Sequence, residues 1–162
     1  EIGACDWSSD VCSSDLDVAA AALTSIDAWR RQAACANLAP PLRLDVGDPA
    51  WIETAPGPWA AILAVNLLHI SPWPTTCALL AGAAVVLAPA GRLLVYGPFA
   101  QDGRLEPSSN VAFDAWLQRE DPAWGVRDIR DIDEVARGHG LSVAGQIAMP
   151  ANNRVLVVER AA

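Results

Sequence analysis

A short spacing near the carboxyl end constrains the fold of this chain most. The segments "LSVAGQIAM", residues 141–149, and "RVLVVER", residues 154–160, both have the composition of strands, and only "PANN" separates them. Parallel neighbours need a crossover of about a dozen residues or more, so these strands are antiparallel if they pair. The sequence therefore predicts a hairpin here, with its turn at Asn152 and Asn153.

The segments before this hairpin alternate between strand and helix patterns. A continuous apolar run at 59–66 and a strand-like core at 93–96 enclose an Ala/Leu-rich helix expected over 74–87. Such an alternation is typical of a parallel sheet with helices on both faces. We expect an α/β fold, a doubly wound and mostly parallel sheet that ends in an antiparallel hairpin. The other expected elements are a strand at 41–46 and helices at 19–36, 111–120 and 131–139.

The stretch "DWSSDVCSSDL", residues 6–16, has neither a helical nor a strand period. In one reading frame, the end of a widely used sequencing adapter translates into the same letters without a mismatch. We therefore interpret residues 5–16 as an artefact of library preparation and exclude them from the fold, which leaves one domain over 17–162. The alternative is a genuine Ser/Asp-rich loop.

Charge and composition exclude several classes of function. The net charge of −8 argues against a protein that grips the nucleic-acid backbone. The longest apolar runs are too short to span a bilayer, and no basic segment precedes an apolar one as in a signal peptide. The four cysteines lack the spacing of a zinc site, which favours reduced thiols in a cytoplasmic protein. We expect no metal, nucleic-acid or membrane partner, and the sequence leaves the oligomeric state open.

Six short motifs follow one another along the chain: "NLLHISPW" at 66–73, "YGPF" at 96–99, "DGR" at 102–104, "PSSNVAFD" at 107–114, "DPAWGVRD" at 121–128 and "MPANN" at 149–153. Over about residues 17–158 the chain resembles a family of short methyltransferase-like proteins of bacteria and animals, long described as a domain of unknown function. The resemblance implies a class I, Rossmann-like methyltransferase fold with S-adenosylmethionine as cofactor. The terminal hairpin agrees with that topology by fold analogy. The methyl acceptor, a small molecule or a protein, stays unknown.

The resemblance also implies that the start of the sheet is incomplete. The family's cofactor loop reads like E-x-A-S-G-T-G-Q-H, and only "EIGA", residues 1–4, remains of it, with Glu1 and Gly3 as remnant cofactor contacts. Closely spaced glycines let the backbone approach the cofactor. The second strand should end in an acid for the ribose hydroxyls, and Asp17 fits that place. We expect the chain as written to bind cofactor poorly and to leave a sheet edge and one apolar face uncovered.

Two further cofactor candidates lie at strand ends, where a doubly wound sheet places its ligands. Asp45 closes the third strand and could reach the adenine, although a loop-capping role fits it equally well. Asn66 ends the buried fourth strand, where its amide could hold the cofactor's amino-acid end or the substrate. Its alternative is a hydrogen bond to backbone.

Two side chains are candidates for catalysis. His69 stands three residues past a strand end, where an imidazole could take the proton of a methyl acceptor. Its alternative is a loop histidine that positions Ser71 and Pro72. Tyr96 follows the fifth strand and could line the substrate pocket, or could be a core tyrosine with its hydroxyl at the rim.

Ser108, Asn110 and Asp114 lie on the next loop and helix and are predicted to cover the substrate side. Ser108 or Asn110 could instead cap that helix. Three functions stay open at this point. The first is a methyltransferase, the second a non-catalytic protein of the same fold that acts through partners, and the third a nicotinamide-dependent oxidoreductase, which would need parallel final strands.

Overall fold

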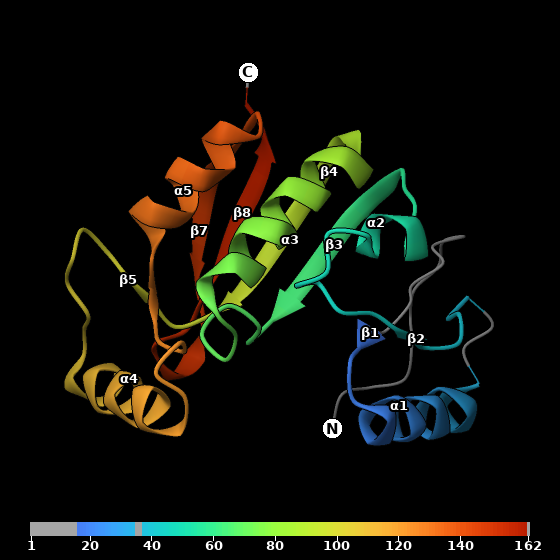
Figure 1. Cartoon of the computed structure of the whole chain (residues 1–162), viewed down its shortest axis with the longest axis horizontal. Coiled ribbons are helices and arrows are strands. Elements are labelled where there is room, and N and C mark those ends of the chain that lie inside the picture. Colours follow the sequence, from blue (N-terminus) through green and yellow to red (C-terminus); the bar gives the residue numbers. More distant parts are fainter. Residues whose placement is uncertain (1–15, 35–36, 162) are drawn as a thin grey trace. The chain divides into compact units, whose positions relative to one another are not determined.

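The computed structural model describes residues 16–34 and 37–161, which fall into two compact units (Figure 1). The first unit ends at Asp45 and the second begins at Val46. In the first, β1 (Leu16–Asp17) pairs in parallel with β2 (Leu42–Arg43), and α1 (Ala20–Ala33) lies between them in sequence. Each unit is described by itself.

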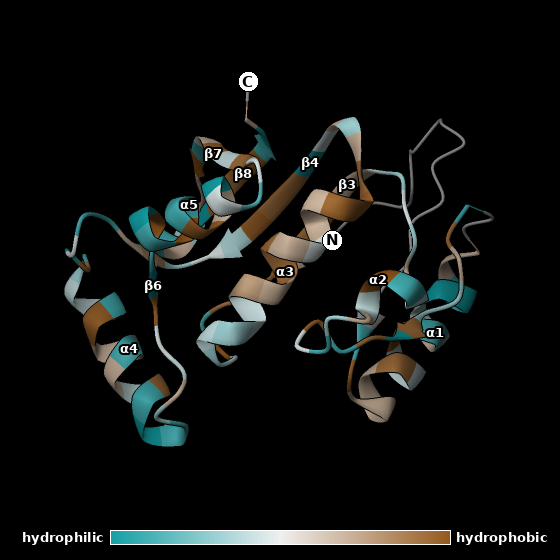
Figure 2. Ribbon diagram, turned by 45° about the horizontal axis from the view of Figure 1, so that its top comes forward, coloured by the Kyte–Doolittle hydropathy of each residue, from teal (hydrophilic) through white to brown (hydrophobic). Residues whose placement is uncertain are grey.

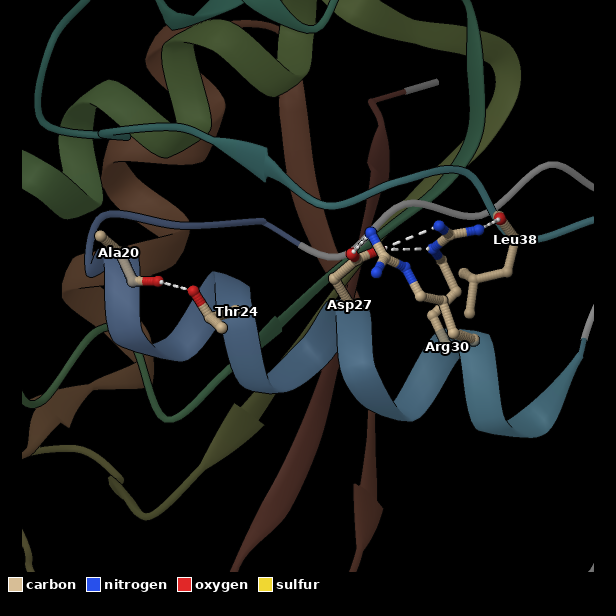
Figure 3. Close-up of polar contacts among 6 residues, drawn as sticks. Ala20, Thr24, Asp27, Arg30 and Leu38 are labelled. Carbon is tan, nitrogen blue, oxygen red and sulfur yellow. Dashed lines mark hydrogen bonds and ion pairs between the residues drawn. The ribbon is translucent and has the colours of Figure 1, made fainter.

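Helix α1 forms where its alanines and leucine favour it, and local contacts support it. Asp27 binds Arg30 and Arg31 through ion pairs of 2.8 and 2.6 Å (Figure 3). The Thr24 hydroxyl donates to the Ala20 carbonyl at 2.9 Å. The helix predicted over 19–36 is confirmed as Ala20–Ala33. No residue of this helix is buried, so its packing contributes little.

The second unit contains a four-stranded sheet in the order β3-β4-β8-β7. Strands β3 (Trp59–Val65) and β4 (Leu87–Gly97) are parallel, whereas β8 (Arg154–Arg160) is antiparallel to both β4 and β7 (Leu141–Ala148). The predicted carboxyl-terminal hairpin is thus confirmed. The other elements are α2 (Trp51–Thr54), α3 (Trp73–Val86), β5 (Phe99–Ala100), α4 (Ser108–Glu120), β6 (Arg127–Asp128), α5 (Ile129–Gly138) and a 3-10 turn at Pro150–Asn152.

The core lies between one face of this sheet and helices α3 and α5 (Figure 1). The register pairs Leu93 with Val158 and Val95 with Leu156, so these four side chains share a face, and each is at most 1% exposed. The predominantly apolar α3 and the apolar centre of β4 stand out in Figure 2. The helix side of the core comes from Leu79, Leu80 and Ala83 of α3 and Ile132 and Ala136 of α5.

The opposite face of the sheet keeps apolar side chains in contact with solvent. Leu63, Val65 and Ile147 are 62%, 53% and 53% exposed, although strand residues of this type are normally covered. Among the described residues, no strand pairs with the edge of β3 that faces away from β4. The expected uncovered face and edge are therefore present in the second unit.

Candidate functional site

The carboxyl ends of β3 and β4 meet at one edge of the sheet, and the candidate site of the second unit lies there. Asn66 directly follows β3 in a left-handed conformation, with φ of 55°, and its backbone N–H donates to the Tyr96 carbonyl at 2.9 Å. Asparagine tolerates this conformation better than most residues. The turn at Asn66 ends the strand and leaves the Asn66 side chain exposed.

The His69 side chain is buried in the loop that follows, and 5% of the residue is exposed. Its ring packs edge-on against Phe113 of α4, with centroids 5.5 Å apart. A Cβ at Gly97 would lie 3.1 Å from His69 Nδ1, so the absence of a side chain at Gly97 makes room for the imidazole. The His69 carbonyl accepts a hydrogen bond from the Gly125 N–H at 3.0 Å, which fixes the loop.

Arg127 holds this loop in place. Its Nε donates to the Leu68 carbonyl at 3.0 Å, and its Nη2 donates to the carbonyls of Ser71 and Ala123 at 2.6 and 2.9 Å. The guanidinium also lies 5.7 Å from the centre of the Trp73 ring. Arg127 was not among the predicted site residues. Its only signal in the sequence was its place in the "DPAWGVRD" motif.

Burial, and after it the positive charge of Arg127, lower the pKa of His69 below 6.5. Burial also lowers the pKa of Arg127, and the nearby Asp114 carboxylate opposes that change. His69 is consequently a neutral imidazole near pH 7. A neutral imidazole can accept a proton, which is what a general base must do.

This lowered pKa predicts a pH dependence of stability. The unfolded chain binds the His69 proton more tightly than the folded chain, so the free energy of unfolding should fall as pH drops below about 6.5 and level off below the folded pKa. Urea unfolding at pH 7.5 and 5.5 should show this loss in the parent chain. His69→Gln should remove most of it, and His139→Gln should keep it. An unchanged loss in His69→Gln would contradict the assignment.

Tyr96 lies on the other side of the strand from His69. Neighbouring residues of a strand point to opposite faces, and a side chain at Gly97, the residue after Tyr96, would point toward His69. The Tyr96 hydroxyl accepts a hydrogen bond from Asn153 Nδ2 at 3.0 Å. The structure therefore does not bring the two predicted catalytic side chains together.

The three residues predicted on the substrate side have different surroundings. Asn110 is buried, and its Nδ2 donates to the Glu106 carbonyl at 3.1 Å. Asp114 accepts from the Val126 N–H at 2.7 Å and from Gln118 Nε2 at 2.8 Å, so it ties α4 to the segment that carries Arg127. Ser108 is exposed at the start of α4, and no side chain caps this helix. The alternative role of a helix cap is thus not observed.

The remaining predicted cofactor contacts belong to the first unit. Asp17 Oδ1 accepts from the Ala19 N–H at 2.7 Å, which shapes the entry into α1. Asp45 is exposed and follows β2, which ends earlier than expected, at Arg43. Glu1 and Gly3 lie outside the described residues.

Within residues 16–34 and 37–161, His, Cys, Asp and Glu form no group of three that could hold a metal ion. No helix in this part of the chain has the length and apolar character needed to cross a membrane.

The fold is that of solved methyltransferase structures. An O-methyltransferase family protein from Burkholderia thailandensis superposes with a TM-score of 0.76 at 16% identity, over 92% of this chain and 43% of that one. The mitomycin 7-O-methyltransferase MmcR gives 0.75 at 17% identity, over 93% and 49%. The O-methyltransferase NcsB1 of neocarzinostatin biosynthesis, solved with S-adenosylmethionine and 2-hydroxy-5-methyl naphthoic acid, gives 0.71 at 15%, over 91% and 41%. The chain thus spans less than half of each of these proteins.

A sequence profile supplies the family. The profile of a family described as "protein of unknown function (DUF938)" matches residues 10–160, which is most of the chain. The chain therefore belongs to the DUF938 family.

Proposed function

We propose that the intact form of this protein transfers a methyl group from S-adenosylmethionine to an acceptor that loses a proton. The observation that carries the proposal is the buried imidazole of His69 at the carboxyl ends of two parallel strands. The lowered pKa of His69 supports it, because a neutral imidazole can accept a proton. Ligands of doubly wound sheets bind at this edge. The similarity in fold to O-methyltransferases, one of them solved with S-adenosylmethionine, supports the same activity.

The described residues suit parts of this cofactor. The exposed Asn66 amide offers both a donor and an acceptor for the amino-acid end. Asp17 and Asp45 remain predicted contacts for the ribose and the adenine. The cofactor, when bound, supplies a methyl group on a sulfonium. His69, kept neutral by its burial and by the charge of Arg127, would accept the acceptor's proton, and Arg127 would hold the loop of His69 in position. Glu1 and Gly3 remain predicted contacts, and Tyr96 remains a candidate on the substrate side.

The test compares the binding of S-adenosylmethionine by the chain as written with that by a chain in which the segment across residues 4–17 is restored. Resequencing the source locus across residues 4–17 should give roughly 20 to 30 residues, the size of a strand, loop and helix that return to the next strand. We expect the chain as written to bind S-adenosylmethionine poorly by calorimetry. The chain with that segment restored should bind at micromolar Kd, about 100-fold tighter or more.

Two variants of the repaired chain sharpen the result. Asn66→Ala should weaken binding about tenfold, since it removes a hydrogen bond to a charged group. Arg92→Gln changes an exposed side chain in the middle of β4, away from its carboxyl end, and should leave Kd unchanged. Absence of binding by the repaired, folded chain would refute the proposal. Unaltered binding in Asn66→Ala would refute the role given to that amide.

The structure bears on one of the alternatives. The oxidoreductase needed parallel final strands, whereas β7 and β8 are antiparallel. A non-catalytic role through partners predicts instead that Asn66→Ala and His69→Ala leave the cellular role intact. Loss of that role in both variants would favour methyl transfer.

A further inference from the structure

A hollow of about 500 Å³ opens in the second unit beyond the end of β4. It is lined by Phe99, Gln101, Asp102, Arg104, Glu106 and Arg154. The predicted site does not include Arg104 or Arg154. The hollow therefore offers two guanidinium groups that have no role in the proposed methyl transfer.

The side chain of Arg154 is held with part of its guanidinium free. Its Nη1 donates to Gln101 Oε1 at 3.1 Å and to Gln146 Oε1 at 2.6 Å. Within the described part of the chain, neither Nη2 nor Nε of Arg154 has a hydrogen-bond acceptor, and no ion pair joins Arg154 or Arg104 to a carboxylate. A guanidinium that is oriented but not paired is well suited to receive a planar anion through two parallel hydrogen bonds.

A tight turn fixes the position of Arg104. Gln101 and Arg104 exchange backbone hydrogen bonds of 2.9 and 3.0 Å across Asp102 and Gly103, whose φ angles are 52° and 76°. The Gly103 N–H donates to Asp128 Oδ2 at 2.5 Å, which anchors the tip of the turn. The backbone at Arg104 is thus positioned by local contacts.

The hollow lies on the same side of the sheet as His69. The register pairs Gly97 with Arg154, so Arg154 leaves its strand on the face to which a side chain at Gly97 would point. A Cβ at Gly97 would lie 3.1 Å from His69 Nδ1 and 3.9 Å from Phe99 Cζ, and Phe99 lines the hollow. His69 and Phe99 therefore both lie beside Gly97, and Phe99 also lines the hollow.

We propose that this hollow binds a carboxylate, and that the methyl acceptor is a small carboxylic acid with an apolar body. The part of the proposal that concerns the acceptor rests on the proposed function. Arg104 and Arg154 would hold the carboxylate, and the apolar body would lie toward Phe99 and His69. Asp102 and Glu106 also line the hollow, and their negative charges repel a doubly charged phosphate more strongly than a carboxylate with a single charge.

The test uses benzoate, benzamide, phenyl phosphate and benzylamine as probes of the whole chain, by calorimetry and by NMR of the two histidine rings. Benzoate should bind and shift the His69 signals but not those of His139. The other three probes should bind at least about tenfold more weakly. Arg154→Gln and Arg104→Gln should each weaken benzoate about tenfold, Arg154→Lys less so, and Arg119→Gln on α4 not at all.

Several results would overturn the proposal: equal binding of benzamide, tighter binding of phenyl phosphate or benzylamine, no binding of benzoate, or no effect of Arg154→Gln in a folded variant. A thermal melt of each variant separates loss of the site from loss of the fold. Benzoate binding without S-adenosylmethionine binding by the repaired chain would refute methyl transfer and leave the carboxylate site standing. The reverse result would refute the carboxylate site alone.

Discussion

Replacing Leu93 by alanine is expected to lower the free energy of unfolding by about 2–5 kcal/mol. Leu93 lies in β4, between β3 and β8, and is fully buried against the core. Its truncation removes apolar contact and leaves a cavity that close-packed neighbours fill only in part. Small proteins have total stabilities of about 5–15 kcal/mol, so urea or thermal unfolding should show a large loss.

Leu63→Ala provides the matched control for Leu93→Ala. The chemistry of the substitution is the same and the strand is the neighbouring one, but Leu63 is 62% exposed on the opposite face. Its expected effect on the free energy of unfolding is within about 0.5 kcal/mol. Equal losses in the two variants would mean that the face carrying Leu63 is covered in solution, contrary to the exposed fractions.

The predictable part of the fold is the part that depends on local spacing. The hairpin of β7 and β8 followed from four residues between two strands, and the structure confirms it. The apolar run that became β3 and the helical pattern that became α3 were also placed to within one residue at each end. These elements carry their own periodicity and turn residues, so tertiary contacts did not need to be known.

Other elements depend on distant contacts, and the sequence did not reveal them. Strand β4 begins at Leu87, well before the expected 93, because its first residue pairs with Trp59 across an irregular register. The short pair β5 and β6 joins segments far apart in the chain and has no periodic pattern of its own. In the first unit the expected strand at 41–46 is reduced to β2, Leu42–Arg43.

The candidate site likewise contains residues that local sequence predicts and residues that depend on distant contacts. Asn66 and His69 were predicted because polar side chains after a buried strand stand where ligands bind. Arg127 was not, since two of the carbonyls it binds, those of Leu68 and Ser71, are 59 and 56 residues away in sequence. The contact between Asp114 and Val126 also forms only once the chain after α4 folds back onto that helix. Contacts of this kind leave no spacing that a single sequence displays.

Arg127→Gln tests whether Arg127 controls His69 as well as the fold. The variant loses the charged hydrogen bonds to Leu68, Ser71 and Ala123, which should lower the free energy of unfolding by about 2–4 kcal/mol. It also removes a positive charge beside the imidazole, so the pKa of His69 should rise toward its ordinary value. NMR titration of the ring protons measures this directly, because the chain has only two histidines.

Two controls separate charge from position in this experiment. Arg127→Lys keeps the charge but cannot reproduce the planar set of donors, so it should lose stability while leaving the pKa of His69 low. Arg119→Gln removes an exposed charge from α4 and should change neither quantity. If the pKa of His69 rises equally in Arg127→Gln and Arg127→Lys, the guanidinium acts on His69 by shaping its loop. A rise confined to Arg127→Gln would instead show that, beyond burial, the charge itself lowers the pKa of His69 and helps keep the imidazole ready to accept a proton.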